Sequence, residues 1–504
     1  MEQYTLVSYA AAAWVAMVVF LVFGRRRSKL NLPPGPKAWP IIGNFNLIGA
    51  LPHRSTHELA QKYGDLMHLK FGSYDVVMAS SVEMAKVFLK TMDANFICRP
   101  KTAAGRYTTY NYKNMNWAPY GAYWREARKM FVVELFSAKR LDSFEYVRVE
   151  EIRSLMKTIH QHYSAAGKEL ELKDILLKVN FNVISRMVLG NNYTDELMSE
   201  EGFKKMLDEV FILNGVLNVG DWIPWLALMD LQGYVKRMKK VAKTFDIFLE
   251  RMLNQRAERR NAKDFVSVDM VDLLLDMADD PNRDINLDME CVKGLTMDLL
   301  NGGTESSAVS VEWVMAELLK NPEKLEKVTQ ELDRVIGKDR WVEEKDLVNL
   351  PYVKAVMMES MRLHPVAPIL IPRRTREDCK VAGYDIPEDT RVFVNVWTIG
   401  RDPKVWEKPE EFYPERFIGK DMDVKGNNFE LLPFGAGRRM CPGYNLGLKV
   451  IQSTLANLIH GFNWKLPGNM TSEDLDMQEV FKLSTPKNIP LVCIAQPRLP
   501  LKMY

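Results

Sequence analysis

Apolar residues recur at helical spacing over much of the chain, with charged residues interleaved between them. This pattern predicts helices over residues 138–165, 201–213, 231–259, 265–278, 288–320 and 322–337, and Asn321-Pro322 marks the junction between the last two. Strand-like alternation is confined to short stretches near 66–79, 380–394 and 488–495. The polar run 254–264 is typical of a solvated loop. We therefore expect a mainly α fold with small β-sheets, formed as one body.

The N-terminus departs from this pattern. Residues 4–23 contain no charge, and about 20 apolar residues span a bilayer core. A basic cluster, 25–29, follows directly, which favours a cytosolic position for the chain beyond it. A cleaved signal peptide is the alternative, but its apolar part would be shorter, about 7–15 residues, and preceded by basic residues. Only Glu2 is charged before this run, so we expect an uncleaved transmembrane anchor with a lumenal N-terminus.

Three segments follow from this reading. We expect a signal anchor with its basic stop over 1–29, a Pro-rich hinge over 30–40 and one globular domain over 41–504. The hinge contains Leu32-Pro33-Pro34-Gly35-Pro36, and prolines make such a segment stiff and extended because they fix φ and remove hydrogen-bond donors. It is expected to act as a spacer between the membrane and the globular body.

Composition and charge exclude several classes of protein. The 504 residues are 47% hydrophobic and 26% charged, as in ordinary globular proteins. The net charge is +3, and residues 1–29 carry four basic residues against one acidic, so the rest of the chain is neutral. A neutral body argues against nucleic-acid binding. The five cysteines include no CxxC pair, which supports neither a zinc ribbon nor a disulfide framework. Phosphate and dinucleotide Gly-rich loops are also absent from the sequence.

The most informative stretch is 433–443, Pro-Phe-Gly-Ala-Gly-Arg-Arg-Met-Cys-Pro-Gly. Its glycines and prolines predict a tight loop that lets backbone approach a flat group, and a helical pattern starts at about Tyr444. A thiolate at Cys441 would be held in its charged form by the helix N-terminus and the arginines. Thiolate ligation is what a haem iron needs to cleave O–O bonds. A structural cysteine after a Gly-rich turn is the alternative, which the complete F-x-x-G-x-R-x-C-x-G pattern disfavours.

On these residues the chain resembles the cytochrome P450 superfamily over nearly its whole length. It is most similar to plant, microsome-anchored A-type members of the flavonoid 3′-hydroxylase-like and homoterpene-synthase-like kinds. The resemblance implies the cytochrome P450 fold preceded by one transmembrane helix, and haem b with Cys441 as axial iron ligand. It also places Phe434 and Gly435 in the haem-binding loop and assigns Arg439 to a haem propionate.

Further motifs follow in the family's order. In Trp124-Arg125-Glu126-Ala127-Arg128, Trp and Arg four apart share one helical face. The resemblance assigns Trp124 and Arg128 to haem binding, with Arg128 on a propionate, and gives Arg373 a similar role. It assigns Glu359, Arg362 and Arg416 to a structural triad behind the haem.

Residues 301–307, Asn-Gly-Gly-Thr-Glu-Ser-Ser, lie within a predicted helix. Two glycines there cost about 1 kcal/mol each, so we expect a local opening of the helix that leaves room for dioxygen. The resemblance pairs a carboxylate with a hydroxyl at this place, and Glu305 and Ser306 are the candidates for delivering protons to oxygen. Serine stands where the family usually has threonine, so its hydroxyl is less restricted.

The resemblance implies an NADPH- and O₂-dependent monooxygenase that oxidises a small lipophilic plant metabolite, phenolic or flavonoid-like first and terpenoid second. Electrons would come from a separate NADPH–cytochrome reductase, with cytochrome b5 as a further candidate partner. We expect a basic docking face from Arg125, Arg128, Lys129, Arg438 and Lys449. The expected location is the endoplasmic reticulum membrane, with a cytosolic catalytic domain. The alternatives are a haem-thiolate isomerase or dehydratase of the same fold, and a noncatalytic haem-binding membrane protein.

Substrate contacts are expected by resemblance in three segments, 103–120, 366–370 and 481–485. The tyrosines of the first segment could line a pocket or cover a loop: Tyr107, Tyr110 and Tyr112.

Overall fold

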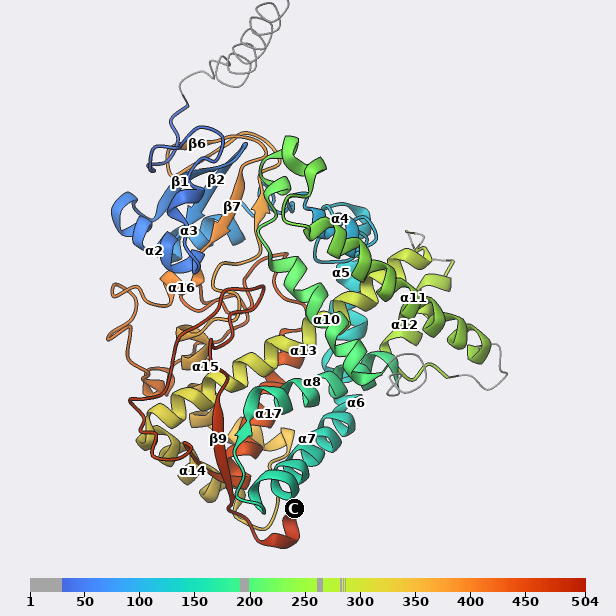
Figure 1. Ribbon diagram of the computed structural model, residues 1–504, viewed down its shortest axis with the longest axis vertical. Helices are drawn as coiled ribbons and strands as arrows, with labels where there is room; N and C mark the ends of the chain where they lie inside the picture. The colour runs from blue at the N-terminus through green and yellow to red at the C-terminus, as the bar shows by residue number, and fades with distance from the viewer. Residues whose placement is uncertain (1–29, 191–198, 261–265, 282, 284, 286) are drawn as a thin grey trace, which may run out of the picture.

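The computed structural model describes residues 30–504 except 191–198, 261–265, 282, 284 and 286 (Figure 1). The expected transmembrane anchor lies outside these residues. Within the described part of the chain, no helix is both long enough and apolar enough to cross a membrane.

Helices make up most of the described chain, as the apolar periodicity predicts. Those of the first half are α2 (Pro52–Tyr63), α3 (Val82–Lys86), α4 (Ala103–Thr108), α5 (Ala122–Lys129), α6 (Ala138–Ser143), α7 (Glu145–Ile159), α8 (Leu172–Leu189), α10 (Glu200–Gly215) and α11 (Tyr234–Arg260). Those of the second half are α12 (Met270–Asp279), α13 (Met289–Lys320), α14 (Pro322–Ile336), α15 (Pro351–Leu363), α16 (Val396–Ile399) and α17 (Tyr444–Gly461). Short 3₁₀ segments include η6 (Pro224–Met229) and η8 (Pro414–Phe417).

The strands form small sheets, also as predicted. They are β1 (Leu66–Phe71), β2 (Tyr74–Ala79), β3 (Leu170–Glu171), β4 (Arg373–Arg374), β5 (Cys379–Val381), β6 (Tyr384–Ile386), β7 (Arg391–Val394), β8 (Phe462–Lys465) and β9 (Val492–Pro497). The largest sheet has the order β1-β2-β7-β4, a second has β3-β9-β8, and β5 pairs with β6. In the largest sheet β1 and β2 form an antiparallel hairpin and β2 runs parallel to β7.

The 32-residue helix α13 crosses the helical part of the molecule and packs against α8 and α17 (Figure 1). Asp288 caps its first turn by accepting a hydrogen bond from the Cys291 N–H at 2.8 Å. Asn321 ends it, and Pro322 occupies the first position of α14, where its missing N–H costs nothing. Because residues 307–319 of α13 are buried throughout, this helix is a rigid wall for the site described below.

The prediction of a solvated loop over 254–264 is wrong for its first part, because α11 continues to Arg260. Arg256 is buried there, with ion pairs to Asp269 at 2.8 Å and to Asp272 at 2.5 Å. Two carboxylates of the next helical segment therefore turn an apparently polar run into an interior contact. Residues 261–264 lie outside the described chain.

The proline-rich segment has no helix or strand over 30–38, and it is hydrogen-bonded to the folded body rather than a free spacer. The His68 N–H of β1 donates to the Pro34 carbonyl at 2.9 Å. A Cβ at Gly35 would lie 1.9 Å from the His68 carbonyl oxygen, so only glycine allows this approach. Asn31 and Asp385 exchange hydrogen bonds at 2.9 and 2.7 Å, which fixes the segment to β6 as well.

Candidate active site

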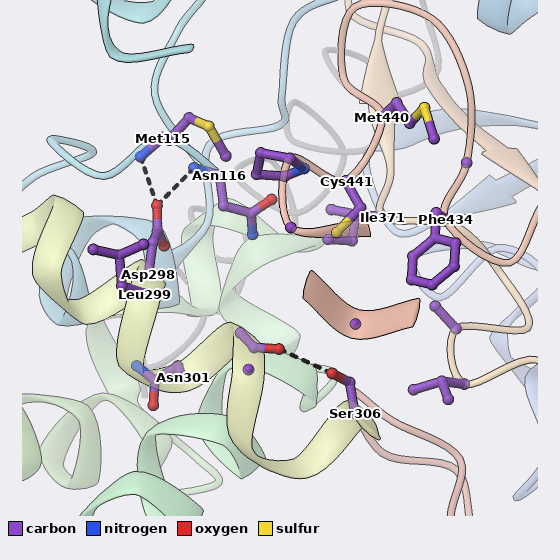
Figure 2. Close-up of a pocket in the computed structure, with 18 of the residues that line it drawn as sticks. Met115, Asn116, Asp298, Leu299, Asn301, Ser306, Ile371, Phe434, Met440 and Cys441 are labelled. Atoms are coloured by element: carbon purple, nitrogen blue, oxygen red, sulfur yellow. Dashed lines mark hydrogen bonds between the residues drawn. The ribbon is translucent and has the colours of Figure 1, made fainter. Parts of the chain in front are cut away.

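A cavity of about 400 Å³ lies between the loop that carries Cys441 and the middle of α13 (Figure 2). Gly302, Gly303 and Ser306 face it from α13. Most other lining residues are apolar, and they come from far-separated segments: Val183, Ile184, Val210, Phe211, Val366, Ala367, Leu370 and Leu483. The cavity is therefore a mainly apolar chamber with the cysteine on one wall and a serine on the opposite one.

The cysteine loop is as tight as its glycines predict. The Cys441 N–H donates to the Phe434 carbonyl at 3.0 Å, closing the loop directly before α17. Gly435 and Gly437 both have φ of 69°, which favours glycine. A Cβ at Gly437 would lie 2.0 Å from the Leu89 carbonyl oxygen. Phe434, Gly435 and Cys441 all line the cavity, so the loop presents the sulfur to it.

The thiol of Cys441 has a raised pKa, whereas the sequence predicts a thiolate held in its charged form by the helix N-terminus and the arginines. Burial raises its pKa, while the Gly443 N–H and the positive charge of Arg128 act in the opposite direction. Desolvation thus outweighs the helix terminus and the arginine, because removing water penalises the thiolate more than one partly buried cation favours it. A metal ion bound to the sulfur would reverse this balance, since a coordinating thiol is deprotonated.

Arginines surround the cysteine side of the cavity. Arg128, on α5, donates to the Met440 carbonyl at 2.6 Å. Arg439 donates to the carbonyls of Ile97, Met115 and Ala118, and its guanidinium lies 4.3 Å from the Trp124 ring centre. Trp124 shares α5 with Arg128, as the four-residue spacing predicts, and donates its indole N–H to the Met115 carbonyl at 3.0 Å.

Arg373, on β4, is buried and donates to the Ala436 carbonyl at 3.0 Å. It also forms an ion pair with Asp93. Arg99, which sequence reasoning missed, is buried beside it and donates to the carbonyls of Ile371 and Pro372 at 2.7 and 2.9 Å. Its only sequence signal was an arginine in the short segment Cys98-Arg99-Pro100.

This set of arginines carries more positive charge than its surroundings neutralise. Among the described residues, Arg99, Arg128 and Arg439 form no ion pair within 4.0 Å. Burial and the neighbouring Arg373 lower the pKa of Arg439 to about 9. An uncompensated buried cluster of this kind favours an anionic ligand. The two carboxylates of haem supply that charge, so the residues present fit a haem bound through Cys441.

On α13, Ser306 faces the cavity and donates to the Gly302 carbonyl at 2.9 Å (Figure 2). Glu305 does not line the cavity; it accepts a hydrogen bond from Ser484 Oγ at 2.9 Å. Burial raises the pKa of Glu305, while the hydrogen bond from Ser484 and, to a smaller extent, the charges of Lys173 and Lys482 lower it. The two predicted proton carriers are consecutive in the sequence, but their side chains lie on different faces of the helix.

The predicted opening of the helix at the two glycines is wrong, because α13 is continuous from Met289 to Lys320. Room is created by the missing side chain: a Cβ at Gly302 would meet nothing within 4 Å. A Cβ at Gly303 would instead lie 2.2 Å from the Ile184 side chain. The first glycine leaves space in the cavity and the second allows α8 to pack closely.

The three residues expected behind the site meet in the interior. Arg362, on α15, donates to Glu359 through two bonds of 2.8 Å, and Arg416, on η8, donates to the same carboxylate at 3.0 and 3.1 Å. All three are buried. Arg362 also donates to the Gly400 and Pro409 carbonyls at 2.5 and 2.6 Å, so the charges are well compensated. This is a buried network rather than a surface ion pair.

The expected substrate segments all reach the cavity, but through few residues. The first contributes Thr109 and the run 114–117, whereas Tyr107, Tyr110 and Tyr112 are not among the lining residues. Tyr110 donates to Asp246 at 3.0 Å and Tyr112 to the Thr102 carbonyl at 2.9 Å, so they cover the loop. Sequence reasoning also missed Asp298, an acid of α13 that lines the cavity.

Comparison with known proteins agrees with this geometry. The family model "Cytochrome P450" matches residues 33–493. Trimethyltridecatetraene synthase of Zea mays is 46% identical over 99% of this chain and 95% of its own length. A flavonoid 3′-monooxygenase of Crocosmia x crocosmiiflora is 42% identical over 97% of each chain. A zebra fish cytochrome P450 structure with abiraterone has a TM-score of 0.76 at 26% identity, covering 89% of this chain and 100% of that one.

Proposed function

The chain belongs to the cytochrome P450 family, whose haem iron is ligated by cysteine and receives electrons from a separate NADPH reductase; on this premise we propose that it inserts one oxygen atom from O₂ into a small lipophilic plant metabolite. Cys441 is the proposed axial ligand. The observation that supports this most directly is the shared chamber, with Cys441 on one wall and Ser306 on the other. When bound, the haem supplies the oxidising chemistry.

The chain's own residues supply binding, orientation and protons. Arg99, Arg128, Arg373 and Arg439, with Trp124, form the cradle for the haem carboxylates. Phe434 and Gly435 shape the loop that presents the sulfur. Ser306 holds a hydroxyl at the chamber wall, and Glu305 lies behind it within reach of polar groups from the C-terminal segment. We propose that Glu305 collects protons on that side and that Ser306 passes them into the chamber.

The proposed substrate class is a phenolic or flavonoid-like molecule first. The chamber is mainly apolar, but the amide side chains of Asn116 and Asn301 are among its polar lining groups, which suits a hydroxylated aromatic body. A terpenoid is the second candidate, favoured by the 46% identity to trimethyltridecatetraene synthase. The proposed alternatives to oxygen insertion, an isomerase or dehydratase and a noncatalytic haem protein, would need neither proton carrier.

The membrane location is likewise a proposal. Apolar side chains are exposed on η6, where Leu228 is 97% and Trp225 63% accessible, and near the start of the described chain, where Trp39 is 63% accessible. Backbone hydrogen bonds from residues 72 and 73 to Ile42 and Trp222 place these two segments beside the same hairpin. This apolar end suits the surface of the endoplasmic reticulum membrane, with a single-pass anchor over 1–29, a Pro-rich connecting segment over 30–40 in place of the expected free hinge, and a cytosolic domain over 41–504.

The reductase docking face is proposed from fewer residues than the five expected. Arg128 is engaged with Met440, and Lys449 is paired with Glu344 at 2.7 Å and Asp142 at 3.3 Å. Arg125, Lys129 and Arg438 are exposed, and the ion pairs of Lys129 with Glu126 at 3.9 Å and of Arg438 with Asp93 at 3.7 Å are longer than those of Lys449. These three remain as the proposed contacts for an acidic reductase surface, with cytochrome b5 as a further candidate partner.

Microsomes containing the full chain and a plant NADPH–cytochrome reductase provide the test. The reduced protein should give the carbon monoxide difference band of a haem thiolate, and a panel of flavonoids, phenolics and terpene alcohols should yield an NADPH-dependent oxygenated product. Isotope from ¹⁸O₂ in that product would support oxygen insertion. A thiolate band with NADPH-independent turnover would point to the isomerase class, and absence of the band would overturn the proposal.

A further inference from the structure

Asp298 is a half-buried carboxylate on the cavity side of α13 that the proton route does not use. It accepts a hydrogen bond from the Asn114 side chain at 2.7 Å. It also accepts from the Met115 N–H at 2.7 Å and the Asn116 N–H at 3.2 Å (Figure 2). The Asp298 carboxylate forms no ion pair within 4.0 Å among the described residues. A buried charge is costly unless it is hydrogen-bonded, so this carboxylate is committed to the loop over 114–118.

The same loop meets the arginine cluster with its carbonyl groups. The peptide group between Met115 and Asn116 donates its N–H to Asp298, and its carbonyl accepts from Arg439 at 3.1 Å and Trp124 at 3.0 Å. This peptide dipole therefore lies between a carboxylate and a guanidinium, each at the end of opposite sign. Such an arrangement polarises and strengthens both hydrogen bonds.

The neighbouring peptides continue this arrangement. The Asn116 carbonyl accepts from Arg99 Nε at 3.3 Å, and the Ala118 carbonyl accepts from Arg439 at 2.6 Å. The Asn114 side chain links the loop to itself by accepting from the Trp117 N–H at 3.0 Å. Two cations of the proposed haem cradle are thus oriented by a loop that is held on its other side by Asp298.

Gly294 lies one helical turn before Asp298 and faces the same loop. A Cβ there would lie 2.9 Å from the Lys113 carbonyl oxygen and 3.2 Å from the Asn114 nitrogen. Those are backbone atoms, so the clash could be relieved only by moving the loop. Glycine at 294 and aspartate at 298 therefore act together: one allows close approach of the loop and the other captures its amides.

We propose that Asp298 is a positioning residue that holds the loop 114–118 against α13, and through that loop directs Arg439 and Arg99 toward the haem carboxylates. The proposal rests on the proposed function only in taking these arginines as the cradle. It also makes the carboxylate a link between the substrate chamber and the cofactor, because Asp298, Asn114 and Asn116 line the chamber as well.

The test compares the full-length Asp298→Asn, Gly294→Ala and Glu312→Gln variants. Glu312 is the matched control: it is a buried carboxylate of α13 that accepts the Leu491 N–H at 2.9 Å and does not line the cavity. Two measurements are made on the haem-loaded protein. One is the rate of haem transfer to excess apomyoglobin; the other is amide hydrogen exchange of a peptide spanning 113–118.

We expect Asp298→Asn to accelerate haem transfer by about 10-fold or more, the size of effect seen when residues that orient ligands are changed. Exchange over 114–118 should accelerate by a similar factor in Asp298→Asn and Gly294→Ala but not in Glu312→Gln. Equal rates in Asp298→Asn and Glu312→Gln would overturn the proposal.

If Asp298→Asn does not fold, the proposal is tested with Gly294→Ala, by the same measurements of haem transfer and amide exchange. Faster exchange without faster haem transfer in that variant would also overturn the link between loop and cradle. Loss of the thiolate band in the unchanged protein would instead overturn the proposed function, so the two failures are distinguishable.

Discussion

Glu305 accepts a hydrogen bond from the Ser484 hydroxyl at 2.9 Å, whereas the next residue, Ser306, faces the chamber. The carboxylate is therefore connected to the C-terminal segment, and the hydroxyl faces the chamber in which we propose that oxygen reacts. Two adjacent residues of one helix thus contact two different regions, the C-terminal segment around Ser484 and the chamber. Because the two side chains contact different regions, we make a separate prediction for each.

Ser306→Ala should lower the fraction of NADPH that yields product, by about 10- to 100-fold, because positioned proton transfer contributes about 10²–10⁴ and water replaces part of it. NADPH use itself should persist, with reduced oxygen appearing as peroxide. The measurement is product and peroxide formed per NADPH. Ser306→Thr is the control and should retain coupling; full coupling in the alanine variant would remove Ser306 from the proton route.

Glu305→Gln should flatten the pH dependence of coupling. Burial raises the pKa of Glu305, so its protonated form persists above the ordinary glutamate value of about 4.3 and is lost as pH rises through the raised value. Coupling in the unchanged protein should fall across that interval, while the glutamine variant stays low throughout. A pH series of product per NADPH checks this, and parallel profiles for the two proteins would contradict it.

Cys441→Ser should abolish the thiolate band in the carbon monoxide difference spectrum and with it product formation, because an alcohol at this position does not supply the thiolate ligand. Cys379→Ser is the matched control, since Cys379 lies on β5, away from the cavity lining. The control should keep both the band and the activity. An intact band in Cys441→Ser would assign the axial ligand elsewhere.

Glu359→Gln should destabilise the protein by about 3–5 kcal/mol, because it leaves Arg362 and Arg416 buried without their carboxylate. Urea unfolding followed by haem absorbance and circular dichroism measures the change. The exposed pair of Lys408 and Glu411, 3.1 Å apart, offers a control in Glu411→Gln, for which less than about 1 kcal/mol is expected. A small effect at Glu359 would show that the network is dispensable.

Gly302→Ala should stabilise α13 by about 1 kcal/mol, since its Cβ meets no atom within 4 Å and alanine favours the helix. The new methyl group should occupy chamber space and reduce product formation. Gly303→Ala should instead destabilise the protein, because the new Cβ would overlap the Ile184 side chain. Thermal unfolding midpoints of the two variants, read with their activities, separate these effects.

Local patterns predicted much of the fold but not the contacts that depend on distant segments. The helix pattern over 288–320 and the start of a helix at Tyr444 are confirmed within one residue, since apolar periodicity and capping residues are local signals. The burial of Arg256 was missed because its partners Asp269 and Asp272 lie on another helix. A charged residue looks solvated until its partner is known.

The site shows the same limit. Cys441, Trp124 and Ser306 were predicted from motifs, and all three line one cavity. Asp298 and Arg99 carry no motif within their own segments, and their importance comes from bonds to residues 17 to 273 positions away. The helix opening expected at Gly302 failed for another reason: an absent side chain creates space without any change in the backbone.

The bonds that join Asn31 to β6 and Pro34 to β1, strands of two different sheets, have a mechanical consequence. A pull or twist applied to the N-terminal end of the chain reaches the folded body at residues 31–36, where it acts as a shearing force on the edges of β1 and β6. Residues 31–36 contain no free length of chain, so a force that acts on them is transmitted directly to β1 and β6. The orientation of residues 31–36 relative to the chamber is then fixed by the folded body.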